Sequence, residues 1–190
     1  MVIIALAVMA MTAVGCYGDV DNGKEPDLTS GLGVIVDCDD NPSEGLEAGG
    51  MALDFRFQDA VGDTFSLSDY RGRVVILNFW SIGCDFCLGE VPYIQQVYNQ
   101  WPEEDLVVLT IDIFDEADAV NAFLEDSGTS LPVLLDREGI VMVQYGVDET
   151  PCTFFIDKEG WIRGIKFGNL ESLEELESII EQVIALQEGG

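Results

Sequence analysis

Two cysteines, Cys84 and Cys87, are separated by two residues in a stretch whose flanks predict a change of secondary structure. The run 74–77 before them is wholly apolar, which is typical of a buried strand. After them apolar residues recur every three or four positions, as on one face of a helix, at Leu88, Val91, Ile94 and Tyr98. A cysteine at a helix N-terminus loses its proton more easily, because unpaired N–H groups and the helix dipole favour an anion, and the thiolate is the nucleophile. The placement therefore predicts thiol–disulfide exchange.

A Cys-x-x-Cys pair is also half of a structural zinc site, and cysteines also serve as core filler. A structural zinc site needs four ligands, and the chain has no histidine and no second close cysteine pair. The lack of histidine also excludes His-based triads, haem axial histidines and His-containing copper sites, so that proton transfer must use carboxylates, thiols, tyrosine, lysine or water. We therefore favour redox chemistry that requires no metal and no organic cofactor.

The composition is strongly acidic, with 36 acidic against 8 basic residues and a formal net charge of −28 over 190 residues. Nucleic acid and anionic membrane surfaces are therefore not expected as electrostatic partners. The charge is explained either by a solvated surface that keeps the protein soluble or by adaptation to high salt, which screens self-repulsion. The length fits one domain with extensions.

The N-terminal residues predict export. Residues 2–14 are apolar apart from Thr12, and the run ends in Ala13-Val14-Gly15-Cys16. This apolar run is short for a membrane span but suits a signal-peptide core. Small residues before a cysteine resemble the lipobox of bacterial lipoproteins, although no Lys or Arg precedes the apolar run. We therefore expect a signal peptide with a lipobox over 1–16, lipidation of Cys16, and a membrane-anchored protein on the extracytoplasmic face, where disulfides persist.

Residues 17–50 are rich in Gly, Asp, Asn and Pro and predict a flexible acidic tether, in which 33–36 is the one candidate strand. Cys38 lies in this stretch. If Cys16 is lipidated, Cys38 is either a free thiol or the partner of Cys152, and the sequence leaves both open. The folded domain is predicted over 51–190.

Within that domain strand and helix patterns alternate. A hairpin is predicted over 54–57 and 64–67, and Asp115 is placed to cap a helix that carries Val120. Ser172 and Glu175 form a capping box for the last helix. Further strands are expected at 106–111, 131–135, 153–156 and 161–165, and a short helix at 140–145. The pattern predicts an α/β sandwich around a mixed sheet.

In this order the motifs resemble the thioredoxin superfamily, and most closely the membrane-associated thiol–disulfide oxidoreductases of the TlpA/ResA type, which carry an AhpC/TSA–redoxin-like domain. The likeness covers about Leu53–Leu186 and rests on Leu67-Ser68-Asp69, Asn78-Phe79-Trp80, the cysteine pair, Glu90-x-Pro92, Tyr145-Gly146-Val147, Thr150-Pro151 and Phe154-x-Ile156-Asp157-x-x-Gly160. It implies a thioredoxin-like α/β/α sandwich around a mixed β-sheet, with an N-terminal β-hairpin and a central αβ insertion.

The resemblance also implies roles. Cys84 would attack a substrate disulfide and Cys87 would resolve the mixed disulfide, so the two form the redox disulfide. The substrates implied are disulfide-containing exported proteins, such as apocytochrome c, and the electron donor is a membrane thiol-transfer protein.

Around the pair, Pro151 matches the family's cis-proline, which lines the substrate groove with Thr150. Glu90 matches a glutamate that tunes the proton affinity of the cysteines; the alternative is a helix-surface charge. Trp80 either shields the site or packs in the core. Cys152 is either a small buried apolar residue or a third thiol within reach.

Departures from the family leave alternatives open. Asp85 should raise the pKa of Cys84 by like-charge repulsion, which predicts a more reducing couple. A peroxiredoxin-like peroxidase would need a threonine three residues before the reactive cysteine and a nearby arginine; here Ser81 and Arg163 are the candidates. A redox-inert module that binds a soft metal through Cys84, Cys87 and Cys152 is the third hypothesis.

Overall fold

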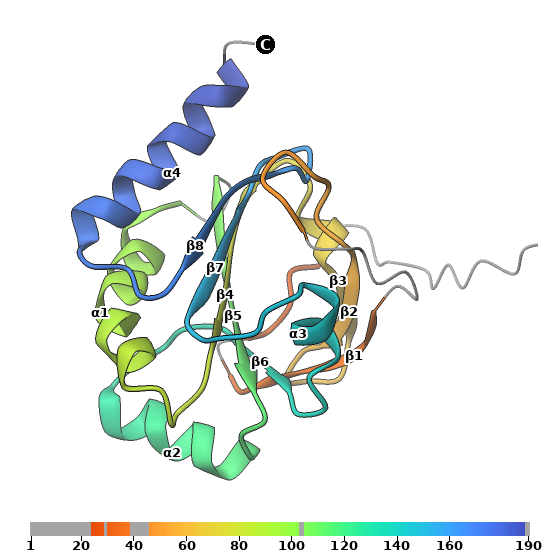
Figure 1. Ribbon diagram of the computed structural model, residues 1–190. Coiled ribbons are helices and arrows are strands. Elements are labelled where there is room, and N and C mark those ends of the chain that lie inside the picture. The colour runs from red at the N-terminus through yellow and green to blue at the C-terminus, as the bar shows by residue number, and fades with distance from the viewer. Residues whose placement is uncertain (1–23, 29, 39–45, 103–104, 189–190) are drawn as a thin grey trace, which may run out of the picture.

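The computed structural model describes residues 24–28, 30–38, 46–102 and 105–188. Its centre is one eight-stranded sheet (Figure 1) with the strand order β3-β2-β1-β6-β5-β4-β7-β8. The inner strands β1, β6, β5 and β4 run parallel, and the remaining pairs are antiparallel, so the sheet is mixed as predicted. The elements are β1 (Gly33–Cys38), β2 (Phe55–Gln58), β3 (Thr64–Ser66), η1 (Leu67–Tyr70), β4 (Val74–Trp80), α1 (Asp85–Gln100), β5 (Leu106–Ile113), α2 (Ala117–Ser127), β6 (Val133–Asp136), α3 (Ile140–Gln144), β7 (Cys152–Ile156), β8 (Ile162–Phe167) and α4 (Leu173–Glu188).

Strand β4 is the strand that positions the cysteine pair. It pairs with β5 on one side and β7 on the other, and helices cover both faces, so all seven of its residues are buried. This explains the unbroken apolar run at its start. The strand ends at Trp80, and helix α1 begins at Asp85 with Cys84 as its N-cap, so the predicted handover from strand to helix is confirmed.

The alternation of side chains along the strands separates two apolar layers. Helices α1 and α4 pack on one face, where Ile94 and Ile180 meet Ile76, and α2 covers the same face beside Trp80. The short helices α3 and η1 lie on the opposite face, where Tyr145 packs against Phe79. Figure 1 shows α1, α2 and α4 to one side of the sheet and α3 to the other.

The expectation of a flexible tether over 17–50 does not hold for Gly33–Cys38, where the candidate strand at 33–36 is confirmed. This segment is strand β1, antiparallel to β2 and parallel to β6. Its alternate residue Ile35 is buried in the same apolar layer as Phe57, and Leu28 before it is buried there too. A short alternating run gains stability only when neighbouring strands supply backbone partners, and these come from residues far along the chain.

The predicted signal peptide, lipobox and lipidation site, residues 1–16 with Cys16, lie outside the described residues. Among the residues that are described, no helix is long and apolar enough to span a membrane. Cys152 is a free, buried thiol, so it forms no disulfide with Cys38.

Candidate active site

Cys84 and Cys87 are joined by a disulfide at the N-terminus of α1, with 5.2 Å between their Cα atoms. The two sulfurs differ in access, since Cys84 is half-buried and Cys87 is completely buried. The Sγ atom of Cys84 accepts the backbone N–H of Cys87 at 3.1 Å and so caps the helix. In the reduced state the same N–H and the helix dipole stabilise a thiolate at Cys84.

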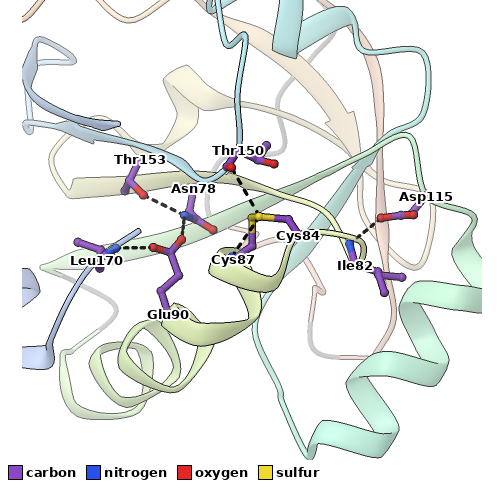
Figure 2. Close-up of a disulfide and its surroundings, with 9 residues drawn as sticks. All are labelled: Asn78, Ile82, Cys84, Cys87, Glu90, Asp115, Thr150, Thr153 and Leu170. Carbon is purple, nitrogen blue, oxygen red and sulfur yellow. Dashed lines mark hydrogen bonds between the residues drawn. A yellow bond between two sulfur atoms is a disulfide. The ribbon is translucent and has the colours of Figure 1, made fainter. Parts of the chain in front are cut away.

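The segment Thr150–Pro151, which directly precedes β7, lies beside the disulfide. The carbonyl oxygen of Thr150 lies 3.5 Å from the Sγ atom of Cys84 (Figure 2), where a reduced thiol can donate to it. The peptide bond between Thr150 and Pro151 is cis. Thr150 is half-buried while Pro151 is buried, so the accessible wall beside Cys84 is made by Thr150.

Glu90 is a buried carboxylate and not a helix-surface charge, since only 1% of it is exposed. Its Oε1 accepts from Nδ2 of Asn78 at 2.8 Å and its Oε2 from the backbone N–H of Leu170 at 2.7 Å. The Asn78 amide also donates to Oγ1 of Thr153 (Figure 2). Burial raises the pKa of Glu90, while the bonds from Leu170 and Asn78 act in the opposite direction. Glu90 therefore holds α1 to β4 and to the segment before α4, and Asn78 extends the network to Thr153 of β7.

Cys152 follows Pro151 and lies beside Phe79 in the sheet register. Burial, and then the negative charge of Glu90, raise the pKa of its thiol to about 12. Such a thiol stays protonated at neutral pH, so it is not a nucleophile there. Of the two roles considered for it, the structure supports the buried apolar one.

Trp80 is buried in an apolar cluster with Cys87, Val120, Val133 and Leu135. Its ring packs against that of Phe123, with 5.4 Å between the ring centroids. The Trp80 side chain therefore packs in the same cluster as the buried Cys87, and it exposes almost no surface that a substrate could contact. Phe86, between the two cysteines, is by contrast 71% exposed.

The helix α2 is not capped by Asp115, contrary to the sequence-based expectation. Its N-cap is Glu116, and Oδ2 of Asp115 instead accepts the backbone N–H of Ile82 at 2.8 Å (Figure 2). The segment that precedes Cys84 is thus fixed by a residue from the end of β5. Sequence inspection missed this link and also missed Asp112, although a charged residue inside the apolar strand β5 was a visible signal.

The alternatives find little support in the geometry. Arg163, the arginine considered for a peroxidase site, forms an ion pair with Asp157 at the end of β7 away from Pro151. In the described part of the chain, no group of three or more His, Cys, Asp or Glu side chains is placed to hold a metal ion.

Comparison with known proteins agrees with this geometry. Residues 48–165 match the AhpC/TSA family. The chain is 34% identical over 138 residues to the thiol-disulfide oxidoreductase ResA of Geobacillus kaustophilus (strain HTA426), covering 73% of this chain and 79% of the relative.

Two solved structures share the fold. A putative thiol:disulfide interchange protein DsbE from Chlorobium tepidum superposes with a TM-score of 0.65 at 26% identity, covering 74% of this chain and 98% of the other. The exposed lipoprotein thioredoxin Etrx1 of Streptococcus pneumoniae strain TIGR4 gives 0.59 at 32% identity, covering 68% and 99%. The predicted thioredoxin-like sandwich is thus confirmed. The chain belongs to the AhpC/TSA family, within which it is a thiol–disulfide oxidoreductase of the thioredoxin-like type.

Proposed function

We propose that the protein reduces disulfides in exported proteins, apocytochrome c among them, with Cys84 as the attacking thiol and Cys87 as the resolving thiol. One observation carries the assignment: the half-buried Cys84 is bonded to a completely buried Cys87 at the N-terminus of α1. A folded substrate reaches only the first of these sulfurs.

The reaction balances as two exchanges. The Cys84 thiolate attacks one substrate sulfur, and the other substrate sulfur leaves as a thiolate and takes up a proton. Cys87 then loses its proton and attacks the Sγ atom of Cys84, which expels the second substrate thiolate and leaves Cys84–Cys87 oxidised. Two electrons and two protons from a membrane thiol-transfer protein restore the dithiol.

Trapping tests this assignment. The Cys87→Ser variant, expressed with its complete N-terminus, should accumulate mixed disulfides at Cys84 that are resolved on non-reducing gels and identified by mass spectrometry. The Cys84→Ser/Cys87→Ser variant is the matched control and should show none. If the single variant traps no protein and the reduced parent does not reduce a disulfide such as that of insulin, the proposal is wrong.

We further assign Glu90 as the group that tunes the cysteine pair, because its charge already acts on the nearby Cys152 thiol. Glu90→Gln removes that charge and should lower the apparent pKa of the reduced pair, followed through thiolate absorbance at 240 nm. Glu174→Gln removes the same charge from an exposed position of α4 and is the control. Equal titration curves for wild type and Glu90→Gln would rule the role out.

Thr150, backed by the buried Pro151, is proposed to form the wall against which the substrate strand lies, and the exposed Phe86 is proposed as a second contact for the substrate. Membrane attachment through Cys16 is proposed on the lipobox and supported by the likeness to an exposed lipoprotein thioredoxin. Cys16→Ala should move the protein from the membrane fraction to the soluble fraction; retention of the variant in membranes would contradict lipid anchoring.

A further inference from the structure

Another buried carboxyl group near the disulfide belongs to β5, the strand that lies beside β4, whereas Glu90 bonds to Asn78 of β4 and to Leu170. Asp112, in β5, is completely buried, and neither of its oxygens accepts a hydrogen bond. In the parallel register it lies between Trp80 of β4 and Leu135 of β6, two members of the apolar cluster that contains Cys87. An ionised carboxylate without a donor is strongly disfavoured in such surroundings.

The neighbour of Asp112 is another acid, Asp115. Burial first, and then the charge and the proximity of the Asp115 carboxylate, raise the pKa of Asp112 to about 8. The backbone N–H of Asp115 acts in the opposite direction without reaching hydrogen-bonding geometry. Two carboxylates have no proton to share, so a hydrogen bond between these two side chains can form only when one of them is protonated.

The described elements packed around Asp112 and Asp115 bring no unpaired positive charge to offset the two acids. The strand neighbours Trp80 and Leu135 carry no charge, and from α1 the titratable group in the cluster is Cys87, which is held in the disulfide. At the start of α2, Glu116 is paired with Arg137. The remaining acid there, Asp118, is exposed.

The carboxyl pair is connected to the redox centre through the backbone. Oδ2 of Asp115 accepts the N–H of Ile82, two residues before Cys84 (Figure 2). We propose that Asp112 is a positioning residue of the active site: when protonated it donates to Asp115 and so holds the segment Ser81–Gly83 that carries Cys84, and when ionised it repels Asp115 and releases that segment. The functional part rests on the proposed role of Cys84.

This arrangement has a kinetic signature. The rate of a thiol reaction rises with pH until the attacking thiol is fully ionised and then stays constant. Release of Ser81–Gly83 adds a fall in the rate above about pH 8, the pKa of Asp112. Asp112→Asn carries an amide that donates to Asp115 at every pH, so it should keep the rate that wild type has at pH 7 and lack the alkaline fall. Asp112→Leu lacks the donor, and we expect its rate to be lower by about tenfold at all pH values, since misplacing a reacting group slows attack.

The first experiment needs no activity. In Cys84→Ser/Cys87→Ser protein with ¹³C-labelled aspartate, the Cγ resonance of Asp112, assigned by its loss in Asp112→Asn, should titrate near pH 8. Adding Asp115→Asn should move that titration to lower pH, because it removes the like charge. A midpoint below pH 6, or no change with Asp115→Asn, would overturn the carboxyl pair.

The second experiment measures single-turnover reduction of a disulfide by the reduced protein from pH 6 to 10. Wild type should fall above pH 8 while Asp112→Asn does not, and Asp112→Leu should be slow throughout. The same alkaline fall in both Asp112→Asn and wild type, or a fast Asp112→Leu, would overturn the positioning role. If wild type reduces no disulfide at all, the proposed function fails, whereas the resonance titration still decides the carboxyl pair.

Discussion

The stability of the protein should depend on pH through Asp112, and a single substitution isolates the effect. The group has no solvent exposure and no donor, and its pKa is raised from 3.8 to about 8 on folding. A folded-state pKa above the unfolded value means that the folded protein binds the proton more tightly. The contribution of the protonated group is therefore fully present below pH 3.8 and is lost as the pH rises toward 8.

The magnitude follows from the two pKa values. At pH 7 the unfolded chain has passed its own midpoint by roughly 3 units, each worth about 1.4 kcal/mol, so the wild-type carboxyl lowers the free energy of unfolding by at most about 4 kcal/mol. Asparagine has a similar shape, cannot ionise and still donates to Asp115. We expect Asp112→Asn to be more stable than wild type by about 2–4 kcal/mol at pH 7 and equally stable at pH 4.

Urea denaturation of the oxidised protein at pH 4, 5, 6, 7 and 8 measures this difference. Asp118→Asn is the matched control, because it removes the same charge from an exposed site on α2 and so corrects for the relief of general self-repulsion. The reasoning is refuted if the curves of wild type and Asp112→Asn run parallel across this range, or if Asp118→Asn reproduces the change.

Three further outcomes are expected. Asp85→Asn removes a negative charge beside Cys84 and favours its thiolate, so the reduction potential measured against glutathione should rise by about 10–30 mV; a fall would contradict the charge argument. Cys152 should resist iodoacetamide at pH 8 in the native reduced protein while Cys84 is alkylated, as mass spectrometry will show, because the pKa of the Cys152 thiol is raised to about 12. With a net charge of −28, reduction of a basic protein disulfide should slow by about tenfold between 10 mM and 500 mM salt, whereas reduction of an acidic one should not.

The sequence predicts the cysteine pair and its elements well, because their signals are local. The apolar run of β4, the helical periodicity of α1 and the cysteine spacing all lie within one short stretch, and the structure has these elements as expected. The environment of Glu90 is different, since its partners Asn78 and Leu170 are 12 and 80 residues away. No local pattern distinguishes such a buried carboxylate from a charge on the helix surface.

The two departures from the sequence-based expectation have the same origin. The sequence offers β1 only as a candidate strand inside a tether, because its partners, β2 and β6, lie up to about a hundred residues further along the chain. The sequence predicts Asp115 as a helix cap because the nearest unpaired donors along the chain are those of α2. The N–H of Ile82, 33 residues earlier, binds it instead. In both cases a partner brought by the tertiary fold replaced the local one.

Two buried carboxyl groups near the disulfide, Glu90 and Asp112, differ in whether their oxygens accept hydrogen bonds. Glu90, which bonds to Asn78 of β4 and to Leu170 before α4, receives a donor on each oxygen, and these donors favour its charged form against the effect of burial. Asp112, on the β5 side, receives none and faces a second acid, so its proton is retained. Exchanging the two chemistries would fail for a physical reason: an amide at Glu90 meets the donors of Asn78 and Leu170 with a donor of its own, whereas at Asp112 it supplies the donor that is missing. The same substitution of carboxyl by amide should therefore act on the titration of the cysteines at one position and on the hold over the segment before Cys84 at the other.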